Sequence, residues 1–311
     1  MIHIMYKSIF AGICLFAVAA CGSAVDDGTG GGGGGGGGLT QNPIPEELAK
    51  NLHQIAYDPA AGTLTVEMTA LDGPDVLATY TRNAALDVPG YSAYTVQDDP
   101  LDRMFIALVT ASNRGTVRAA AVGDGGQFNR FYNGGYYERT GAYSIPTANP
   151  VTGLVSYAGQ YAGVTNVDEP GGPNLLPIPP GTPPETIPGQ PRRTQGEIFL
   201  NVSFSDSTIN GTIYNRSFVG GGALESVTLI PATIDNNGEF LGAVEFFGDP
   251  ATGTIGNYGG IFGGTDASDV AGIVYLDDFI RTADFDNEVG IFVLPRCGTV
   301  GESPICTAVR P

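Results

Sequence analysis

Tryptophan is absent from this chain of 311 residues, and lysine and histidine are almost absent. Lysine occurs only at Lys7 and Lys50, and histidine only at His3 and His53. With a formal net charge of −18, the chain lacks the basic surface that nucleic acid or anionic lipid would need. We therefore expect no nucleic-acid partner, and the acidity suits either solubility alone or a basic protein partner.

Catalytic signatures are missing as well. His53 is the only histidine beyond the first twenty residues, and no GxSxG, HExxH, CxxC or P-loop pattern occurs. The lack of tryptophan also removes a usual stacking platform for sugars. We expect no catalytic residue, no cofactor and no enzyme activity. A cell-envelope hydrolase that uses paired turn carboxylates stays open as an alternative.

The first twenty residues have the pattern of a signal peptide. Lys7 precedes an apolar run from Ile9 to Ala20, and small residues come before Cys21. The segment Val18–Cys21 resembles the lipobox of bacterial lipoproteins. That resemblance implies that Cys21 becomes the acylated, palmitate-bearing first residue, and Gly22 after it favours the outer membrane.

Residues 21–45 are expected to form a flexible tether, because Gly30–Gly38 is an uninterrupted glycine run. A short helix is expected at Pro45–Leu52, and from about His53 the pattern alternates between apolar and polar residues. Abundant Gly and Pro favour short strands joined by turns. We predict an antiparallel β domain over residues 46–149, with strands at Thr63–Thr69, Val76–Arg82, Ser92–Val96, Arg103–Ala111, Thr116–Val122 and Tyr136–Ile145.

The second half of the chain predicts a small eight-stranded antiparallel barrel over residues 150–311. A proline-rich segment at 166–195 cannot pair in a sheet and is expected to be a stiff, extended loop. Such a barrel has no exposed edges and room only for its own side chains or one small ligand. The expected strands are Gly153–Val164, Glu197–Phe204, Thr208–Asn215, Ser226–Ile234, Glu239–Phe246, Asn257–Phe262, Ala271–Leu276 and Glu288–Leu294.

The stretch Gly256–Leu276 organises this region, since two glycine-containing strands meet there at the polar turn GGTDAS. Asp266 precedes Asp269 by three residues, a spacing that predicts a short helical turn capped by Asp266. The stretch resembles the motif that closes the barrels of transferrin-binding protein B and related surface lipoproteins. The residues that carry the resemblance are Phe262, Gly264, Thr265, Ala267, Asp269, Val270 and Gly272. Asp269 departs from the usual Glu, and Ala271 from a common Gly.

This resemblance covers Leu154–Leu294 and is to the single-lobe members of the group that includes factor H-binding protein. It implies an all-β fold in which a handle-like sheet precedes the barrel. It also implies a binding function at the cell surface, with a protein or an iron- or haem-bearing ligand as partner. The contact surface that it implies is the first domain and the loops at one end of the barrel. A lipocalin-like carrier of a small apolar ligand in the periplasm stays open as the main alternative.

Tyrosine and arginine, which protein-binding surfaces favour, are concentrated between Phe128 and Tyr143. We single out four residues there as a possible ligand surface: Tyr132, Tyr136, Tyr137 and Arg139. Packing in the core or at the barrel rim is the alternative. The proline-rich loop is a second candidate surface.

Cys297 and Cys306 are expected to form a disulfide, because an exported chain oxidises such a pair and no further metal ligands lie near them. Acidic residues gather in two places, at Asp98, Asp99 and Asp102, and at Asp277, Asp278, Asp284, Asp286 and Glu288. Solvated turn residues are the expected reading, and a calcium site is the alternative. We expect no metal.

Overall fold

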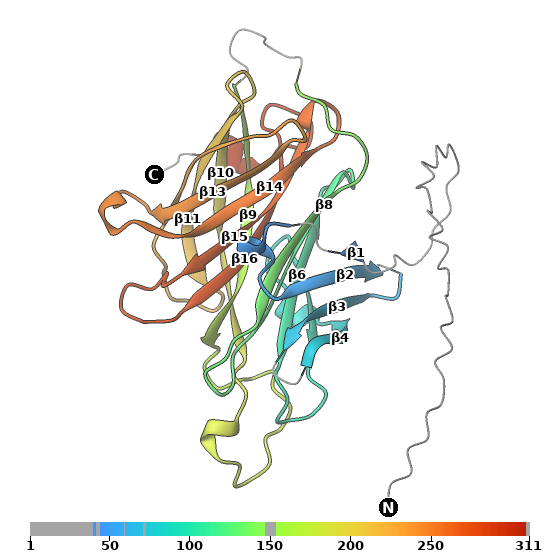
Figure 1. The fold of residues 1–311 in the computed structure, drawn as a ribbon, viewed down its shortest axis with the longest axis vertical. Coiled ribbons are helices and arrows are strands. Elements are labelled where there is room, and N and C mark those ends of the chain that lie inside the picture. Colours follow the sequence, from blue (N-terminus) through green and yellow to red (C-terminus); the bar gives the residue numbers. More distant parts are fainter. Residues whose placement is uncertain (1–39, 42–43, 59, 71–72, 147–153, 309–311) are drawn as a thin grey trace, which may run out of the picture. The chain divides into compact units, whose positions relative to one another are not determined.

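The computed structural model describes residues 40–308 apart from 42–43, 59, 71–72 and 147–153 (Figure 1). The predicted signal peptide, the predicted lipidation site Cys21 and the glycine run therefore lie outside the described residues. Almost all regular structure in the described part is β-strand, so the all-β prediction is confirmed.

The N-terminal region is one antiparallel sheet whose strands follow each other in chain order. Its burial pattern explains why the chain folds this way. In β3, Leu64, Val66 and Met68 are buried, and the residues between them are more exposed. The strands are β1 (Thr40–Gln41), β2 (Leu52–Asp58), β3 (Thr63–Ala70), β4 (Gly73–Arg82), β5 (Ser92–Val96), β6 (Phe105–Ala111), β7 (Val117–Asp124) and β8 (Asn133–Arg139).

The second half closes into an eight-stranded antiparallel barrel, as predicted. Consecutive strands pair with each other, and β16 pairs with β9 to close the ring. The strands are β9 (Leu154–Asp168), β10 (Pro191–Ser203), β11 (Thr208–Phe218), β12 (Val227–Thr233), β13 (Glu239–Phe246), β14 (Thr254–Gly263), β15 (Asp269–Asp277) and β16 (Asn287–Pro295).

Helix is restricted to single turns in the described residues. The helix expected over Pro45–Leu52 is shorter, because Lys50 adopts a positive φ of 50° and β2 begins at Leu52. Helix α1 covers Glu46–Ala49, and the 3₁₀ turns are η1 (Ala84–Leu86), η2 (Pro184–Thr186), η3 (Pro250–Thr252), η4 (Thr265–Ala267) and η5 (Pro304–Thr307). None of these helices is long and apolar enough to cross a membrane.

Several strand boundaries differ from the prediction, and the differences at β8 and at the proline-rich loop change the described architecture most. The strand expected over Tyr136–Ile145 is β8, which starts and ends earlier, at Asn133 and Arg139. The proline-rich loop is shorter than 166–195, because β9 continues to Asp168 and pairs there with Pro191, the first residue of β10. Pro can begin a strand since that position needs no donated ladder bond.

One wall of the barrel is buried on both faces. In β15, Val270 and Val274 point into the barrel, whereas Ala271 and Ile273 pack with the N-terminal sheet. Strands β7 and β8 cover β9, β15 and β16 from outside. Because side chains alternate across a strand, these three strands serve two hydrophobic cores at once.

Candidate functional site

The barrel interior is filled by its own side chains. Phe262 is fully buried, and its ring lies 5.2–6.4 Å from four other rings, those of Tyr143, Tyr157, Phe204 and Phe240. Rings at these separations are in direct contact. Phe262, the aromatic residue of the barrel-closing motif, is therefore the centre of the packing at one end of the barrel.

A buried ion pair occupies another part of the interior. Arg216 Nη2 lies 2.9 Å from Glu288 Oε2, and both side chains are fully buried. The Tyr161 hydroxyl donates to Glu288 Oε1 at 2.5 Å, and burial, followed by the neighbouring Glu288 charge, raises the pKa of Tyr161 well above its ordinary value. Glu288 was expected to be a solvated turn acid, and this expectation is wrong because the residue faces inward from β16.

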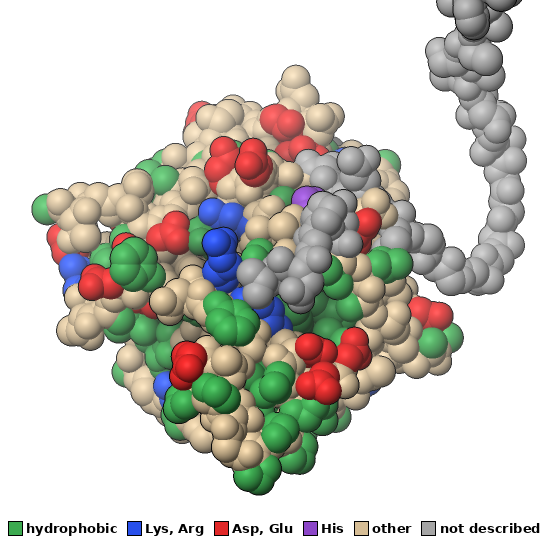
Figure 2. All heavy atoms as spheres, turned by 60° about the horizontal axis from the view of Figure 1, so that its bottom comes forward, with side chains coloured by type: hydrophobic (Ala, Val, Ile, Leu, Met, Phe, Trp, Pro, Cys, Tyr) green, Lys and Arg blue, Asp and Glu red, His purple; other side chains and the backbone are tan. Residues whose placement is uncertain are grey.

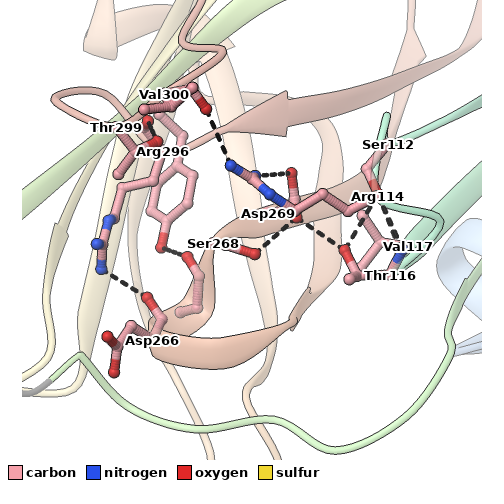
Figure 3. A network of polar contacts seen from close by, with 12 residues as sticks. Ser112, Arg114, Thr116, Val117, Asp266, Ser268, Asp269, Arg296, Thr299 and Val300 are labelled. Atoms are coloured by element: carbon pink, nitrogen blue, oxygen red, sulfur yellow. Dashed lines mark hydrogen bonds and ion pairs between the residues drawn. The ribbon is translucent and has the colours of Figure 1, made fainter.

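The polar corner before β15 joins the barrel to the N-terminal sheet (Figure 3). Asp269 is 2% exposed and accepts hydrogen bonds from Thr116 Oγ1 at 2.8 Å and Ser268 Oγ at 2.7 Å. Arg114 Nη1 lies 3.4 Å from its other oxygen, and Arg114 also donates to the Val300 carbonyl. Asp269 thus connects the start of β15 to the turn between β6 and β7.

The capping role predicted for Asp266 is wrong. The residue before η4 is Gly264, no side chain caps the turn, and Asp266 itself has a positive φ of 55°. Its backbone makes the contacts instead: its N–H donates to Ser144 Oγ, and its carbonyl accepts from Arg296.

Four of the five remaining motif residues have packing roles. A Cβ on Gly264 would lie 2.3 Å from Ser268 Oγ, and one on Gly272 would lie 2.3 Å from the Phe292 ring, so both sites require glycine. Ala267 is buried, and its carbonyl accepts from the Tyr157 hydroxyl. Val270 lies in the barrel core, whereas Thr265 is the first residue of η4 and is exposed at the surface.

A cleft of about 410 Å³ opens on the N-terminal sheet. Its floor is apolar and includes Met68, Ala78, Tyr80 and Phe105 from β3, β4 and β6. At its mouth Phe128 is 53% exposed and adopts a positive φ of 55°. A cleft of this size and lining is the usual form of a binding site in proteins.

Two glutamines hold the walls of this cleft. Gln127 donates from Nε2 to the carbonyls of Leu101 and Thr186, which ties the proline-rich loop to the turn after β5. Gln97 accepts from the Leu176 N–H at 2.8 Å and donates to the Asp102 carbonyl at 3.0 Å. The proline-rich loop is therefore fixed against the cleft at two points.

A buried ion pair lies beneath the cleft. Arg103 is paired with Asp124, and it also donates to the carbonyls of Arg130 and Gln127. Burial raises the pKa of the Asp124 carboxyl above its ordinary value, and the Arg103 charge opposes this shift without cancelling it. Because its guanidinium is engaged in these bonds, Arg103 acts mainly as a support for the cleft.

The rim of the cleft is acidic. Asp98 and Asp102 line it, and both are exposed, as is Asp99 between them. Figure 2 brings forward the end of the molecule where the loop before β10 lies, and apolar side chains gather there beside acidic ones. An apolar floor with a negative rim suits a ligand that has apolar and basic groups.

Of the four residues predicted as a ligand surface, two are buried and two are half-buried. Tyr136 and Tyr137 are 4% and 5% exposed and belong to the core of the sheet, so they offer no contact area. Tyr132 is half-buried beneath the Arg103 guanidinium. Arg139 donates to the carbonyls of Asn237 and Phe262, which joins β8 to the barrel.

The disulfide between Cys297 and Cys306 is present, as predicted. It packs with Ile305 on the outside of the barrel. Among the described residues, these two cysteines and Glu302 are the one group close enough together to hold a metal ion, and the disulfide removes both thiolates. His53 is the histidine of the described part, and its Nε2 forms a hydrogen bond of 2.8 Å with Thr69 Oγ1 at the surface.

The sequence did not reveal the cleft, although it marked some of its parts. The Asp98–Asp102 turn, the start of the Phe128–Tyr143 segment and the proline-rich loop were each noted separately. Their meeting depends on contacts such as that between Gln127 and Thr186, 59 residues apart. No local pattern contains that information.

The fold and the cleft define a class of protein, an all-β chain with an open apolar cleft on a sheet that flanks a filled barrel. No protein-family model matches the chain, and no curated protein matches it either. The solved structures that are similar to it include those of transferrin-binding protein B.

Three of these structures illustrate the degree of likeness. The intact Ap-TbpB structure, with N and C lobes, shares 11% identity with a TM-score of 0.37 over 80% of this chain and 55% of that one. A double mutant of the Haemophilus parasuis protein shares 12% identity, with a TM-score of 0.37 over 79% of this chain and 54% of that one. The protein from serogroup B Neisseria meningitidis shares 15% identity, with a TM-score of 0.34 over 79% of this chain and 52% of that one. The chain spans about half the length of these structures, and at such scores the likeness says nothing about what it binds.

Proposed function

We propose that this chain is a bacterial lipoprotein, anchored to the outer membrane through Cys21, that binds a protein ligand at the cleft of its N-terminal sheet. The ligand is an external protein at the cell surface, and proteins that carry iron or haem are among the candidates. The tether covers residues 21–45, and the sheet and the barrel are two domains that meet near residue 150. The observation that carries the proposal is the open apolar cleft with Phe128 exposed at its mouth.

Phe128 supports a binding role, because its exposed ring and its left-handed backbone both cost free energy in the folded chain. The side chain is 53% exposed, and its left-handed backbone costs about 1–3 kcal/mol. Leu101 and Val76, 38% and 37% exposed, line the same cleft. Apolar side chains gathered around a concave surface are typical of sites that a partner covers.

The carrier alternative receives no support from the barrel. A lipocalin-like carrier needs an open apolar interior, whereas here Phe262 and its four neighbouring rings occupy one end. The Arg216–Glu288 pair occupies space elsewhere in the interior. We therefore place ligand binding outside the barrel.

The anchoring part of the proposal has its own test. Cells that express the chain would be grown with a labelled fatty acid, and intact cells would then be treated with protease. We expect label on the wild type, none on Cys21→Ala, and loss of the folded part from unbroken cells. Label on the Cys21→Ala variant would disprove the anchor, and full protection until lysis would place the chain inside the envelope.

The binding part is tested with two matched variants. Phe128 and Phe247 are similarly exposed, at 53% and 49%, but only Phe128 lines the cleft. Phe128→Asp should weaken capture of the surface ligand by about 30-fold, since a central aromatic anchor contributes about 2 kcal/mol or more. Phe247→Asp should leave capture unchanged. Equal capture by both variants and the wild type would contradict the assignment of the cleft.

A further inference from the structure

The sheet that carries the cleft has a gap between two of its strands. Strand β4 pairs with β3 along most of its length, from Gly73 to Thr81. On its other side it pairs with β5 only at Thr81 and Arg82. Among the described residues, the β5-facing edge of β4 before Thr81 therefore has no ladder partner.

The direction of the free backbone groups follows from one hydrogen bond. The Asn83 N–H donates to the Ala93 carbonyl across the β4–β5 pair. In an antiparallel ladder the residues that face one neighbour alternate along the strand. Thr81 therefore also faces β5, and so do Thr79 and Leu77, whose N–H and C=O groups point into the gap. Ala78 and Tyr80 face β3.

Both faces of the gap are hollow. On one face lies the apolar cleft of about 410 Å³, lined by Val76, Ala78 and Tyr80 of β4. On the other lies a more polar hollow of about 240 Å³, lined by Thr79 and Thr81 of the same strand. A strand placed in the gap would point alternate side chains into the two hollows, which is the arrangement that strand addition requires.

The charge around the gap selects the occupant. Asp98 lines both hollows, and the exposed Asp99 and Asp102 lie beside it. A second copy of the chain, with a formal net charge of −18, would bring a second acidic rim against this one. A partner segment with basic residues avoids that repulsion.

We propose that β4 binds an extended segment of a partner protein as an added antiparallel or parallel strand, with apolar side chains toward the 410 Å³ cleft and basic side chains near Asp98, Asp99 and Asp102. This inference rests on the proposed binding function and specifies its mode. Main-chain bonds to Leu77 and Thr79 supply affinity, and the apolar cleft and the acidic rim supply specificity.

The test measures amide hydrogen exchange by NMR in the presence of a synthetic peptide. The probe is an acetylated and amidated peptide of about seven residues that alternates valine and lysine. In the free protein, Leu77 and Thr79 should exchange quickly, and Ala78 and Tyr80 slowly. With the peptide at about ten times its Kd, exchange at Leu77 and Thr79 should slow about tenfold, because only the free fraction exchanges.

Two controls test whether binding depends on the basic side chains of the peptide and on the acidic residues beside the gap. A peptide that alternates valine and glutamate should give no protection. The Asp98→Asn, Asp99→Asn and Asp102→Asn triple variant should bind the lysine peptide several-fold more weakly and with less dependence on salt. These exposed aspartates are outside the core, so the variant is expected to fold.

Several results would overturn the inference. Peptide binding that shifts Tyr80 and Phe105 signals but leaves Leu77 and Thr79 unprotected would disprove strand addition while the cleft remains a binding site. No binding at about 1 mM peptide, the weak end of peptide affinities, would disprove it too. Slow exchange at Leu77 before peptide is added would show that the edge is already paired, and a mass that doubles as exchange slows would identify a second copy as the occupant.

Discussion

Asp269 offers the sharpest test of how the barrel is joined to the N-terminal sheet. Replacing Asp269 by Ala removes the acceptor of two hydrogen bonds, from Thr116 and Ser268, and the partner of Arg114. Each bond to a charged acceptor contributes about 1.5–3 kcal/mol, but the two hydroxyls are only partly buried and can bind water in the variant. The Arg114 side chain is 42% exposed, so its ion pair adds about 0–1 kcal/mol.

The expected loss for Asp269→Ala is therefore about 2–4 kcal/mol in the free energy of unfolding. At about 2–4 °C per kcal/mol for a chain of this size, the Tm should fall by about 5–15 °C. Asp266→Ala is the matched control. It lies in the same corner and interacts through its backbone, but Ala suits its positive φ less well than Asp does, so it should lower stability by about 1 kcal/mol, less than Asp269→Ala.

Urea unfolding followed by circular dichroism measures both variants. A Thr116→Val variant adds a double-mutant cycle, in which the losses for Thr116 and Asp269 should be less than additive because they share one bond. An Asp269→Ala variant that unfolds like the wild type would show that Asp269 does not stabilise this corner. An Asp266→Ala variant that is as damaging as Asp269→Ala would show instead that the capping role is real.

Three further outcomes follow from the barrel. Glu288→Gln should cost about 3–5 kcal/mol in urea unfolding, because it breaks a fully buried ion pair, and a loss below about 1 kcal/mol would contradict the described burial. Burial raises the pKa values of Tyr161 and Tyr258 above those of the unfolded chain, so the stability that these groups confer is present below about pH 10 and is lost as the pH rises further. Tyrosinate absorbance of these two should appear only together with loss of the fold; ionisation within a folded barrel would refute their burial. Cys297→Ser with Cys306→Ser should lower stability by about 2–3 kcal/mol from loop entropy, and calorimetry that finds no change would show that the loop is ordered without the bond.

The barrel was predictable because its signals are local. Strand β13 was predicted and found at Glu239–Phe246, since apolar alternation and the Asn237-Gly238 turn lie within one short stretch. Closure of eight such strands follows from their number and tight connections. The disulfide was equally local, with Cys297 and Cys306 nine residues apart.

The roles of single acidic residues were not predictable. The spacing of Asp266 and Asp269 suited a capping box, yet Asp269 reaches Thr116, which is 153 residues away in the sequence. Glu288 stands among turn acids in the sequence, but its place on the inward face of β16 buries it against Arg216. Spacing shows which residues are neighbours along the chain, and it does not show what a side chain meets after folding.

Tyrosine content was misleading for a related reason. Tyr136 and Tyr137 are adjacent on β8 and point to opposite faces of it, and both rings are buried because both faces are covered, which the sequence could not show. The cleft instead uses Phe128, a few residues earlier, because the chain turns there with a positive φ and leaves that ring at the surface. Aromatic residues of one short segment are therefore buried at Tyr136 and Tyr137 and exposed at Phe128.

We propose that a partner protein occupies the cleft of the N-terminal sheet at the cell surface. Photo-crosslinking on intact cells tests it most directly, with a photoreactive phenylalanine analogue in place of Phe128 or, as the control, in place of the equally exposed Phe247. The account predicts a crosslinked partner protein from position 128, none from position 247, and loss of the adduct when protease is added outside the cells. An adduct from position 247 alone, or none from position 128 in cells supplied with the ligand source, would contradict it.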